Sequence, residues 1–181
     1  MSPTPTPGQT VGPFFHHALP YPGDRDLVAP GTPGAVRLHG TVTDGDGAPV
    51  PDALVEIWQA DPAGRVVARS GSLRRDGHTF TGFGRSSTDR EGGYTFTTLT
   101  PGAVGGGLPF FAVTVFARGL LNRLFTRAYL PLADGAADAL LASVPAERRA
   151  TLLCRADDRG FVFDIRLTGE GETVFLRFPG Q

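Results

Sequence analysis

The stretch VRLHGTVTDGDGAPVPDALVEIWQAD, residues 36–61, decides the fold class of this chain. Its first eight residues alternate between apolar or small side chains and polar ones, which is the period of a β-strand with one buried face. Two Asp-Gly pairs at 44–47 then mark a turn, and the apolar run at 53–58 has the composition of a second strand. The pattern therefore predicts two strands joined by a turn.

Further segments of the same kind follow. Apolar and β-branched runs separated by turn residues occupy positions 93–99, 110–117, 123–130, 160–168 and 172–178. One segment, 138–155, instead has apolar residues at helical spacing, and Pro145 within it is placed to begin a second short helix. The sequence predicts an all-β protein, an antiparallel β-sandwich with a short helical insertion.

The first 35 residues are rich in proline and glycine. Such a segment resists helix and sheet and favours turns or polyproline II, because proline has no amide donor. Its apolar residues, which include Phe14 and Phe15, exceed what a solvated tail needs. We expect residues 1–35 to form an arm that packs on a partner or on its own core. Residues 36–181 are expected to form the β-sandwich domain, with short helices near 137–154.

The stretch LPFFAVTVFARG, residues 108–119, is apolar on both faces. In a strand, Phe110, Ala112 and Phe116 point one way, while the alternate residues point the other way. An antiparallel sheet in a small sandwich usually leaves one face to water. The pattern therefore predicts that something covers the second face of this strand.

Charge and composition exclude several classes of partner. The formal net charge is −1, which gives no electrostatic reason to expect nucleic acid or an anionic membrane as a partner. A single cysteine, Cys154, allows no internal disulfide framework and suits a reducing compartment. No signal-peptide pattern and no apolar run of membrane-spanning length are visible, so we expect a cytoplasmic protein.

Residue chemistry alone predicts no catalytic site. The four histidines, His16, His17, His39 and His78, form no HxH or HxxxH pattern, so each is expected at the surface or in a hydrogen bond. Glu56 and Asp164 lie within strand segments and are expected to face a strand arginine or a backbone donor. Cys154 follows two leucines and is expected to be a small buried hydrophobic residue.

Six stretches together resemble the intradiol ring-cleavage dioxygenases. They are QTVGPFF (9–15), the stretch 40–65 ending in DPAGR, FGRSSTDREGGYTFTTLTPG (83–102), ARG (117–119), TRAYL (126–130) and FDIRLTGEGETVF (163–175). Within this family, the stretches resemble most specifically the α subunits of the hetero-oligomeric members. The resemblance implies a prealbumin-like sandwich core. The turn at 44–47 is weak evidence by itself, because prealbumin-like domains share it.

The resemblance implies where iron ligands would lie. Catalytic members of the family hold a non-haem Fe(III) through two tyrosines and an HxH on a strand, whose residues i and i+2 share one face. The tyrosine positions correspond to Val66 and to about Val104, and the HxH corresponds to Phe110 and Ala112. All four are hydrocarbon here, so this chain is expected to bind no metal and to have no catalytic residue of its own.

The resemblance also implies a partner. A homologous β subunit would hold Fe(III), and α–β pairs would share the mouth of the active site. There the enzyme would cleave protocatechuate with O2 to 3-carboxy-cis,cis-muconate, a step of the β-ketoadipate pathway of aromatic catabolism. Thr10, Gly12, Pro13 and Arg118 match α-subunit residues at the rim of that cavity, where an arginine would attract a carboxylated catechol.

Two alternatives stay open at this point. The chain could be a self-sufficient intradiol enzyme that uses other ligands, for which Tyr94, Tyr129 and His78 are the spare candidates. It could instead be a prealbumin-like binding or interaction module without an enzymatic partner. A neighbouring reading frame that encodes two tyrosines and an HxH would favour the subunit over the module.

Overall fold

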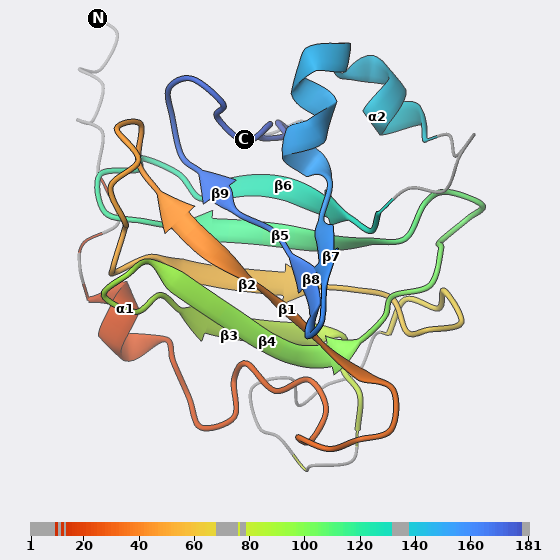
Figure 1. The fold of residues 1–181 in the computed structure, drawn as a ribbon. Coiled ribbons are helices and arrows are strands. Elements are labelled where there is room, and N and C mark those ends of the chain that lie inside the picture. Colours follow the sequence, from red (N-terminus) through yellow and green to blue (C-terminus); the bar gives the residue numbers. More distant parts are fainter. Residues whose placement is uncertain are drawn as a thin grey trace, which may run out of the picture.

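The computed structural model describes residues 10, 12, 14–67, 76, 79–131 and 138–178, which form two stacked β-sheets (Figure 1). One sheet has the strand order β4–β1–β8–β7, with β9 also paired to β1, and the other has the order β3–β2–β5–β6. The strands are β1 (Ala35–Thr43), β2 (Leu54–Trp58), β3 (Phe83–Ser87), β4 (Gly93–Leu99), β5 (Phe110–Phe116), β6 (Leu124–Tyr129), β7 (Arg155–Asp157), β8 (Gly160–Val162) and β9 (Ile165–Arg166). The predicted antiparallel β-sandwich is confirmed.

The core lies between the two sheets. Leu38, Val42 and Phe96 fill it from one sheet, while Ile57 and Phe111 fill it from the other, and all five are fully buried. Strands β4 and β5 alternate strictly between buried and half-buried residues, as the period of two requires. Hydrophobic burial on these inner faces therefore sets the register of both sheets.

The segment predicted as one strand over 160–168 is broken in two. β8 pairs in parallel with residues 37–39 of β1, and β9 pairs in parallel with residues 42–43. Between them the backbone of Phe163 crosses close to Gly40, where a side chain on β1 would collide with the Phe163 carbonyl oxygen. Asp164 next to the break accepts hydrogen bonds from the amide and hydroxyl of Thr41, both at 3.0 Å.

One further strand prediction was wrong, and two strands were missed. Residues 172–178 form no strand, and they are joined to β6 by an isolated bridge between Leu176 and Phe125 and by a hydrogen bond from the Thr126 hydroxyl to the Val174 carbonyl. Strands β3 and β7 were missed. Both are short and polar, so their pairing is decided by the neighbouring strands β2 and β8 and not by an apolar period of their own.

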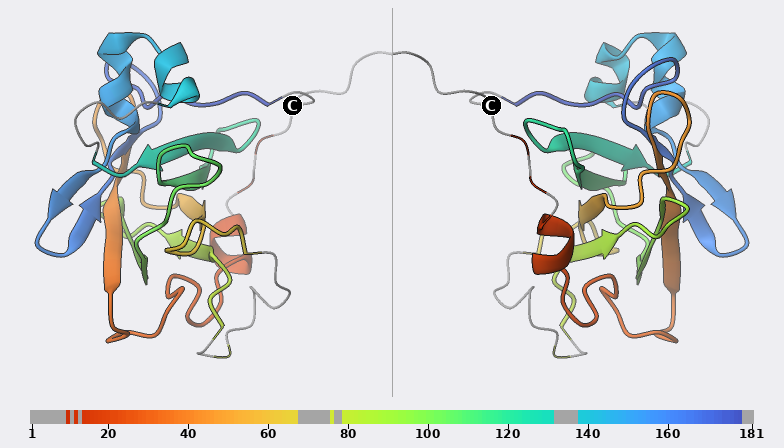
Figure 2. Two further views of the ribbon diagram at one scale, coloured as in Figure 1. Left: turned by 90° about the vertical axis from the view of Figure 1, so that its right-hand side faces the viewer. Right: turned by 90° about the vertical axis from the view of Figure 1, so that its left-hand side faces the viewer.

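The outer face of β5 is covered at one end by helix α1 (Phe15–Ala18), which lies outside the β3–β2–β5–β6 sheet (Figure 2). Phe15 is buried there, with its ring centroid 6.5 Å from that of Phe116. Arg85 of β3 holds the end of the helix by donating a hydrogen bond of 2.6 Å to the Leu19 carbonyl. The half-buried ion pair between Arg85 and Glu56 of β2 positions that guanidinium, and it confirms the expectation that Glu56 faces a strand arginine.

The helical insertion consists of α2 (Ala139–Ser143) and the 3-10 helix η1 (Ala146–Leu152), stacked over the other end of the sandwich (Figure 2). Leu141 and Leu152 pack there with Tyr129 at the end of β6 in a second hydrophobic cluster. In the part of the chain that the structure describes, no helix has both the length and the apolar composition of a membrane span.

Candidate functional site

The structure brings the four sequence-predicted iron-ligand positions together around one pocket. Val66, Val104, Phe110 and Ala112 all line a cavity of about 340 Å³, which lies where β2 ends and β5 begins. Phe110 and Ala112 are residues i and i+2 of β5 and share its outer face. The other two lie on loops that meet the same strand end, which is the right-hand side of the molecule in Figure 1.

The loop that carries Val66 is built by Asp61. The Asp61 carboxylate accepts hydrogen bonds from the backbone amides of Ala63 and Arg65, and Val66 then pairs with Ala60 across the turn. The backbone hydrogen bond from Arg65 and the others made to this carboxylate hold the pKa of Asp61 below its ordinary value. The loop geometry is thus fixed, although the Val66 side chain is 72% exposed.

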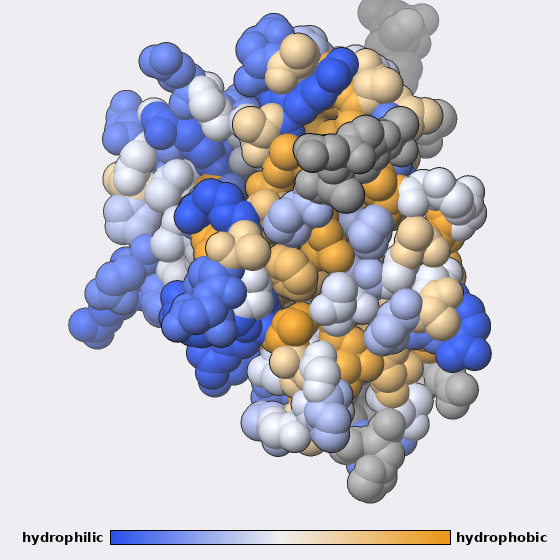
Figure 3. Space-filling model, turned by 45° about the vertical axis from the view of Figure 1, so that its right-hand side comes forward, coloured by the Kyte–Doolittle hydropathy of each residue, from blue (hydrophilic) through white to orange (hydrophobic). Residues whose placement is uncertain are grey.

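The floor of the pocket follows from strand register. Ala112 of β5 lies directly between Trp58 of β2 and Arg127 of β6, so the three side chains share one row on the outer face of the sheet. Because alanine is small, it leaves a hollow between the indole and the guanidinium. On the face that Figure 3 shows, hydrophobic residues form a band between more hydrophilic regions. Trp58, Val66 and Val104 are large exposed hydrophobic side chains that line the pocket.

The polar groups of the pocket form a chain of hydrogen bonds. Arg127 donates to the Tyr129 hydroxyl at 3.0 Å, and that hydroxyl donates to an oxygen of Asp138 at 2.9 Å. The same Asp138 oxygen caps helix α2 by accepting from the amides of Leu140 and Leu141. Burial alone would raise the pKa of Asp138, but the hydrogen bonds from Leu141, Tyr129 and Leu140 lower it overall, so the carboxylate is ionised.

These side chains do not fit a ferric ion. Fe(III) sites need several anionic or imidazole donors, whereas the four predicted positions offer only carbon and no lone pair. One oxygen of Asp138 already accepts from three donors, which leaves one carboxylate oxygen as a possible ligand, and Tyr129 is a neutral phenol whose pKa is raised by burial. Within the described residues, no group of three His, Cys, Asp or Glu side chains is arranged to hold a metal.

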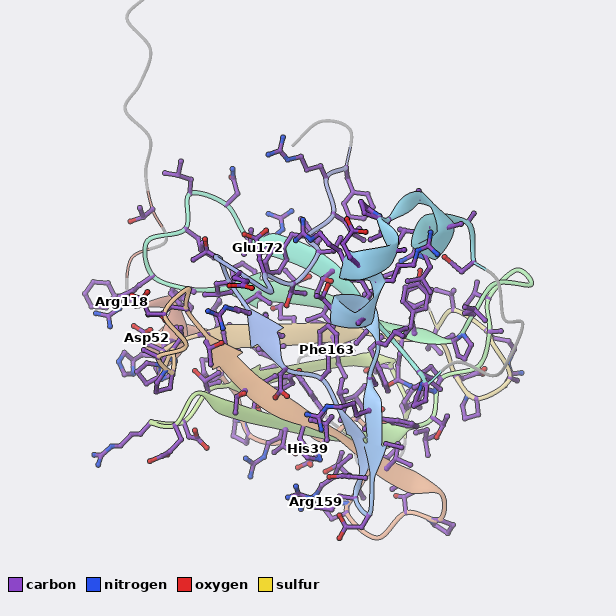
Figure 4. All side chains as sticks on the ribbon, turned by 45° about the horizontal axis from the view of Figure 1, so that its top comes forward. His39, Asp52, Arg118, Arg159, Phe163 and Glu172 are labelled. Atoms are coloured by element: carbon purple, nitrogen blue, oxygen red, sulfur yellow. The ribbon has the colours of Figure 1, made fainter. Side chains whose placement is uncertain are left out.

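Of the four predicted rim residues, the three that the structure describes, Thr10, Gly12 and Arg118, do not line this pocket. Arg118 follows the opposite end of β5, eight residues after Phe110, a separation on the order of 25 Å for an extended strand. It forms an ion pair with Asp52, beside which Figure 4 shows it at one end of the sandwich. Thr10 and Gly12 are exposed, and Pro13 lies outside the described residues. The chain therefore has two separate candidate regions.

The remaining candidates have structural roles. His39 lies 3.0 Å from Asp157, and Asp164 pairs with Arg155 at 2.8 Å, which confirms the expected hydrogen-bonding roles. Cys154 is buried as expected, and burial raises the pKa of its thiol to about 12, which removes it as a nucleophile. Tyr94 is buried and donates to the Phe163 carbonyl. His78 lies outside the described residues.

Arg127, Asp138 and Trp58 were missed as pocket residues by sequence reasoning. Arg127 and Tyr129 stand two residues apart on a strand, so their common face was readable from the stretch TRAYL. Their position beside Ala112 was not readable, because it depends on how β5 and β6 are aligned.

Comparison with known proteins gives one consistent family. A family model described as "Dioxygenase" matches residues 11–107. The protocatechuate 3,4-dioxygenase alpha chain of Burkholderia cepacia is 40% identical over 94% of this chain and 96% of its own length, and that of Pseudomonas putida is 36% identical over 96% of each. The beta chain of the Burkholderia cepacia enzyme is 34% identical over 93% of this chain and 78% of its own length.

Solved structures agree on the fold. The dioxygenase domain of a carbohydrate-binding fusion protein from Streptomyces sp. SirexAA-E superposes with a TM-score of 0.57 at 27% identity, over 92% of this chain and 99% of that chain. Catechol 1,2-dioxygenase from Acinetobacter sp. ADP1 gives a TM-score of 0.54 at 22% identity, over 85% of this chain and 60% of that chain, and so supports the sandwich architecture alone.

Proposed function

We propose that this chain, which belongs to the intradiol ring-cleavage dioxygenase family, is the non-catalytic α subunit of a protocatechuate 3,4-dioxygenase. Its partner is a homologous β subunit that holds the Fe(III). The pair cleaves protocatechuate with O2 between the two hydroxyl-bearing ring carbons to give 3-carboxy-cis,cis-muconate. Both oxygen atoms of O2 enter the product, so no other reductant is needed.

One observation carries the division of labour. The positions that we match to the family's metal ligands, Val66, Val104, Phe110 and Ala112, line one pocket, and none of these four side chains can donate a lone pair to a metal. Similarity to both an α and a β chain of one enzyme supports a hetero-oligomer of related subunits. Similarity along nearly the full length of α chains favours the subunit over an isolated prealbumin-like module. A single buried cysteine suits a complex in the reducing cytoplasm.

The proposed contribution of this chain to the active site is its N-terminal arm and Arg118. Thr10, Gly12 and Phe14 are exposed around helix α1, and Phe14, which is 78% exposed, offers an aromatic ring that a partner could cover. Arg118 is also largely exposed. A β subunit seated at this end of the sandwich would cover Phe14 and place Arg118 at the rim of its cavity.

Arg118 is expected to attract the substrate carboxylate. In the assembled complex, Arg118→Ala should raise the KM for protocatechuate about five- to tenfold and change kcat less than about twofold, because the lost interaction is made equally in ground and transition states. Steady-state kinetics with the purified complex measures both constants.

Asp52→Asn is the matched control for Arg118. It removes the carboxylate that pairs with Arg118, so KM should fall or stay the same. A fall in kcat with an unchanged KM in the Arg118→Ala complex would contradict the attracting role.

The arm is expected to work in assembly. Deleting residues 1–14 leaves Phe15 in its contact with Phe116, so the chain should fold normally.

The single change Phe14→Ser should raise the dissociation constant of the αβ pair at least about tenfold, because a large aromatic side chain at an interface typically contributes that much. Analytical ultracentrifugation of the mixed subunits measures it, and an unchanged dissociation constant for both variants would show that the arm is only a tail.

A further inference from the structure

We propose that the pocket over Ala112 is a second ligand site, which binds a small aromatic monocarboxylate with its ring over Ala112 and its carboxylate on Arg127. The site is distinct from the rim region at Arg118 and is lined by residues of this chain. Three features favour such a ligand: the shape of the hollow, its aromatic and aliphatic walls, and Arg127, the one cation among the described residues that line it.

The hollow has the size and shape for one aromatic ring. Its volume of about 340 Å³ falls in the range of small-molecule sites. Ala112 forms the floor, Trp58 rises on one side and Arg127 on the other, because the three residues are paired across β2, β5 and β6. Trp58 packs against Phe83 with ring centroids 4.7 Å apart, which holds the indole wall in place.

The walls favour an apolar ligand. Trp58 is 47% exposed and Val104 is 39% exposed, so each leaves apolar surface in water on the rim of the hollow. Phe110 adds an aromatic side chain next to Ala112 on the same face of β5. A planar ring that fills the hollow would remove these surfaces from water and could stack on the indole, both of which favour binding.

Arg127 gives the site its preference for a carboxylate. Its guanidinium carbon lies 4.1 Å from the centroid of the Phe110 ring, which supports the cation in a defined orientation. It donates one hydrogen bond to Tyr129, and its charge acts on Asp138 through space, but among the described residues no carboxylate lies within ion-pair distance of it. A guanidinium has five N–H donors, so a fork of donors is available to bind both oxygens of a ligand carboxylate.

Asp138 limits the charge of the ligand. It is the anionic group that lines the pocket, and its charge is stabilised by the Tyr129 hydroxyl and by the backbone amides at the start of α2. A second carboxylate on the ligand would meet Asp138 and find no further cation among the lining residues. The site therefore suits a monoanion and disfavours aromatic dicarboxylates such as phthalate.

Benzoate is the probe for this site, and benzamide is its neutral isostere. Trp58 is the single tryptophan of the chain, so its fluorescence in the purified full-length chain reports occupancy of the pocket. Benzoate should quench or shift that emission. Its dissociation constant should be at least about tenfold lower than that of benzamide, because hydrogen bonds to a charged group typically contribute that much binding free energy. Isothermal titration calorimetry gives the same constants independently of the indole.

Three variants decide the result. Arg127→Met should weaken benzoate binding about tenfold or more and leave benzamide within about twofold, whereas Ala112→Phe should fill the hollow and abolish binding of both. Arg123→Met is the matched control, because Arg123 also lies over an aromatic ring, that of Phe125, but does not line the pocket. The proposal would be overturned if the unaltered chain did not bind benzoate, or if the Arg127→Met or the Ala112→Phe chain bound benzoate as tightly as the unaltered chain does.

Discussion

Purified without a partner, the full chain should be colourless, contain no iron and show no ring-cleaving activity. When it is produced together with its β subunit, the complex should be red-brown, because tyrosinate ligands of Fe(III) absorb visible light. The physical reason is the donor set: Val66, Val104, Phe110 and Ala112 present only carbon to the space where relatives are expected to bind the metal. Elemental analysis and an absorption spectrum of the two preparations check this directly.

Val66→Ala is the matched control for the iron prediction. If the pocket has no part in metal binding, the complex that carries this variant should keep its iron content and its kcat within about twofold, as expected for a change at an exposed side chain away from the chemistry. Iron bound stoichiometrically by the lone chain would instead support the self-sufficient enzyme, and the loss of that iron in Tyr129→Phe or His78→Ala chains would identify its ligands.

Gly40→Ala is expected to destabilise the chain by about 3 kcal/mol, at the upper end of overpacking effects. The new Cβ would collide with the carbonyl oxygen of Phe163, where the chain crosses β1 between β8 and β9. That carbonyl cannot move away easily, because it accepts a 2.5 Å hydrogen bond from the Tyr94 hydroxyl and the Phe163 amide donates to the His39 carbonyl at 2.8 Å. Figure 4 labels His39 and Phe163 at this crossing.

Denaturant unfolding of the full chain, followed by circular dichroism, measures this loss. Arg37→Ala on the same strand is the control, since its exposed side chain should change the unfolding free energy by less than about 0.5 kcal/mol. Tyr94→Phe removes the hydrogen bond that holds the Phe163 carbonyl. The double variant Gly40→Ala/Tyr94→Phe should therefore lose less unfolding free energy than the two single variants lose together. Strict additivity would show that the collision is relieved elsewhere.

The strands with a strong apolar period were predictable from the sequence. β4 and β5 bury strictly alternate residues, while β1, β2 and β6 were found as apolar or alternating runs between turn signals although their buried residues do not alternate strictly. β3 and β7 were not predictable, because both are short and polar and have no apolar period of their own; β3 pairs with β2 across a long intervening segment, and β7 pairs with β8 in a tight hairpin. The break between β8 and β9 was hidden because Phe163 and Ile165 continue the apolar period across it, while the hydrogen bonds of the backbone do not.

The candidate site, too, could be predicted from the sequence only in part. The absence of metal donors at Val66, Val104, Phe110 and Ala112 was an expectation from resemblance, since the identity of a side chain is a property of the sequence. Strand alignment and loop closure decide that these residues surround one hollow. They also place Arg127 across the hollow from Trp58. The pairing of Arg118 with Asp52 likewise joins residues from two different strand ends.

By itself, the sequence determined which faces of the strands are apolar and which chemistry the side chains can supply, because both depend on residue type and on the fixed period of a β-strand. Only the tertiary structure decided what those faces enclose. Cross-strand register places Ala112 between Trp58 and Arg127, and the crossing at Gly40 splits one apparent strand into two. Register and crossing are set by contacts between segments far apart in the chain, which no local pattern encodes.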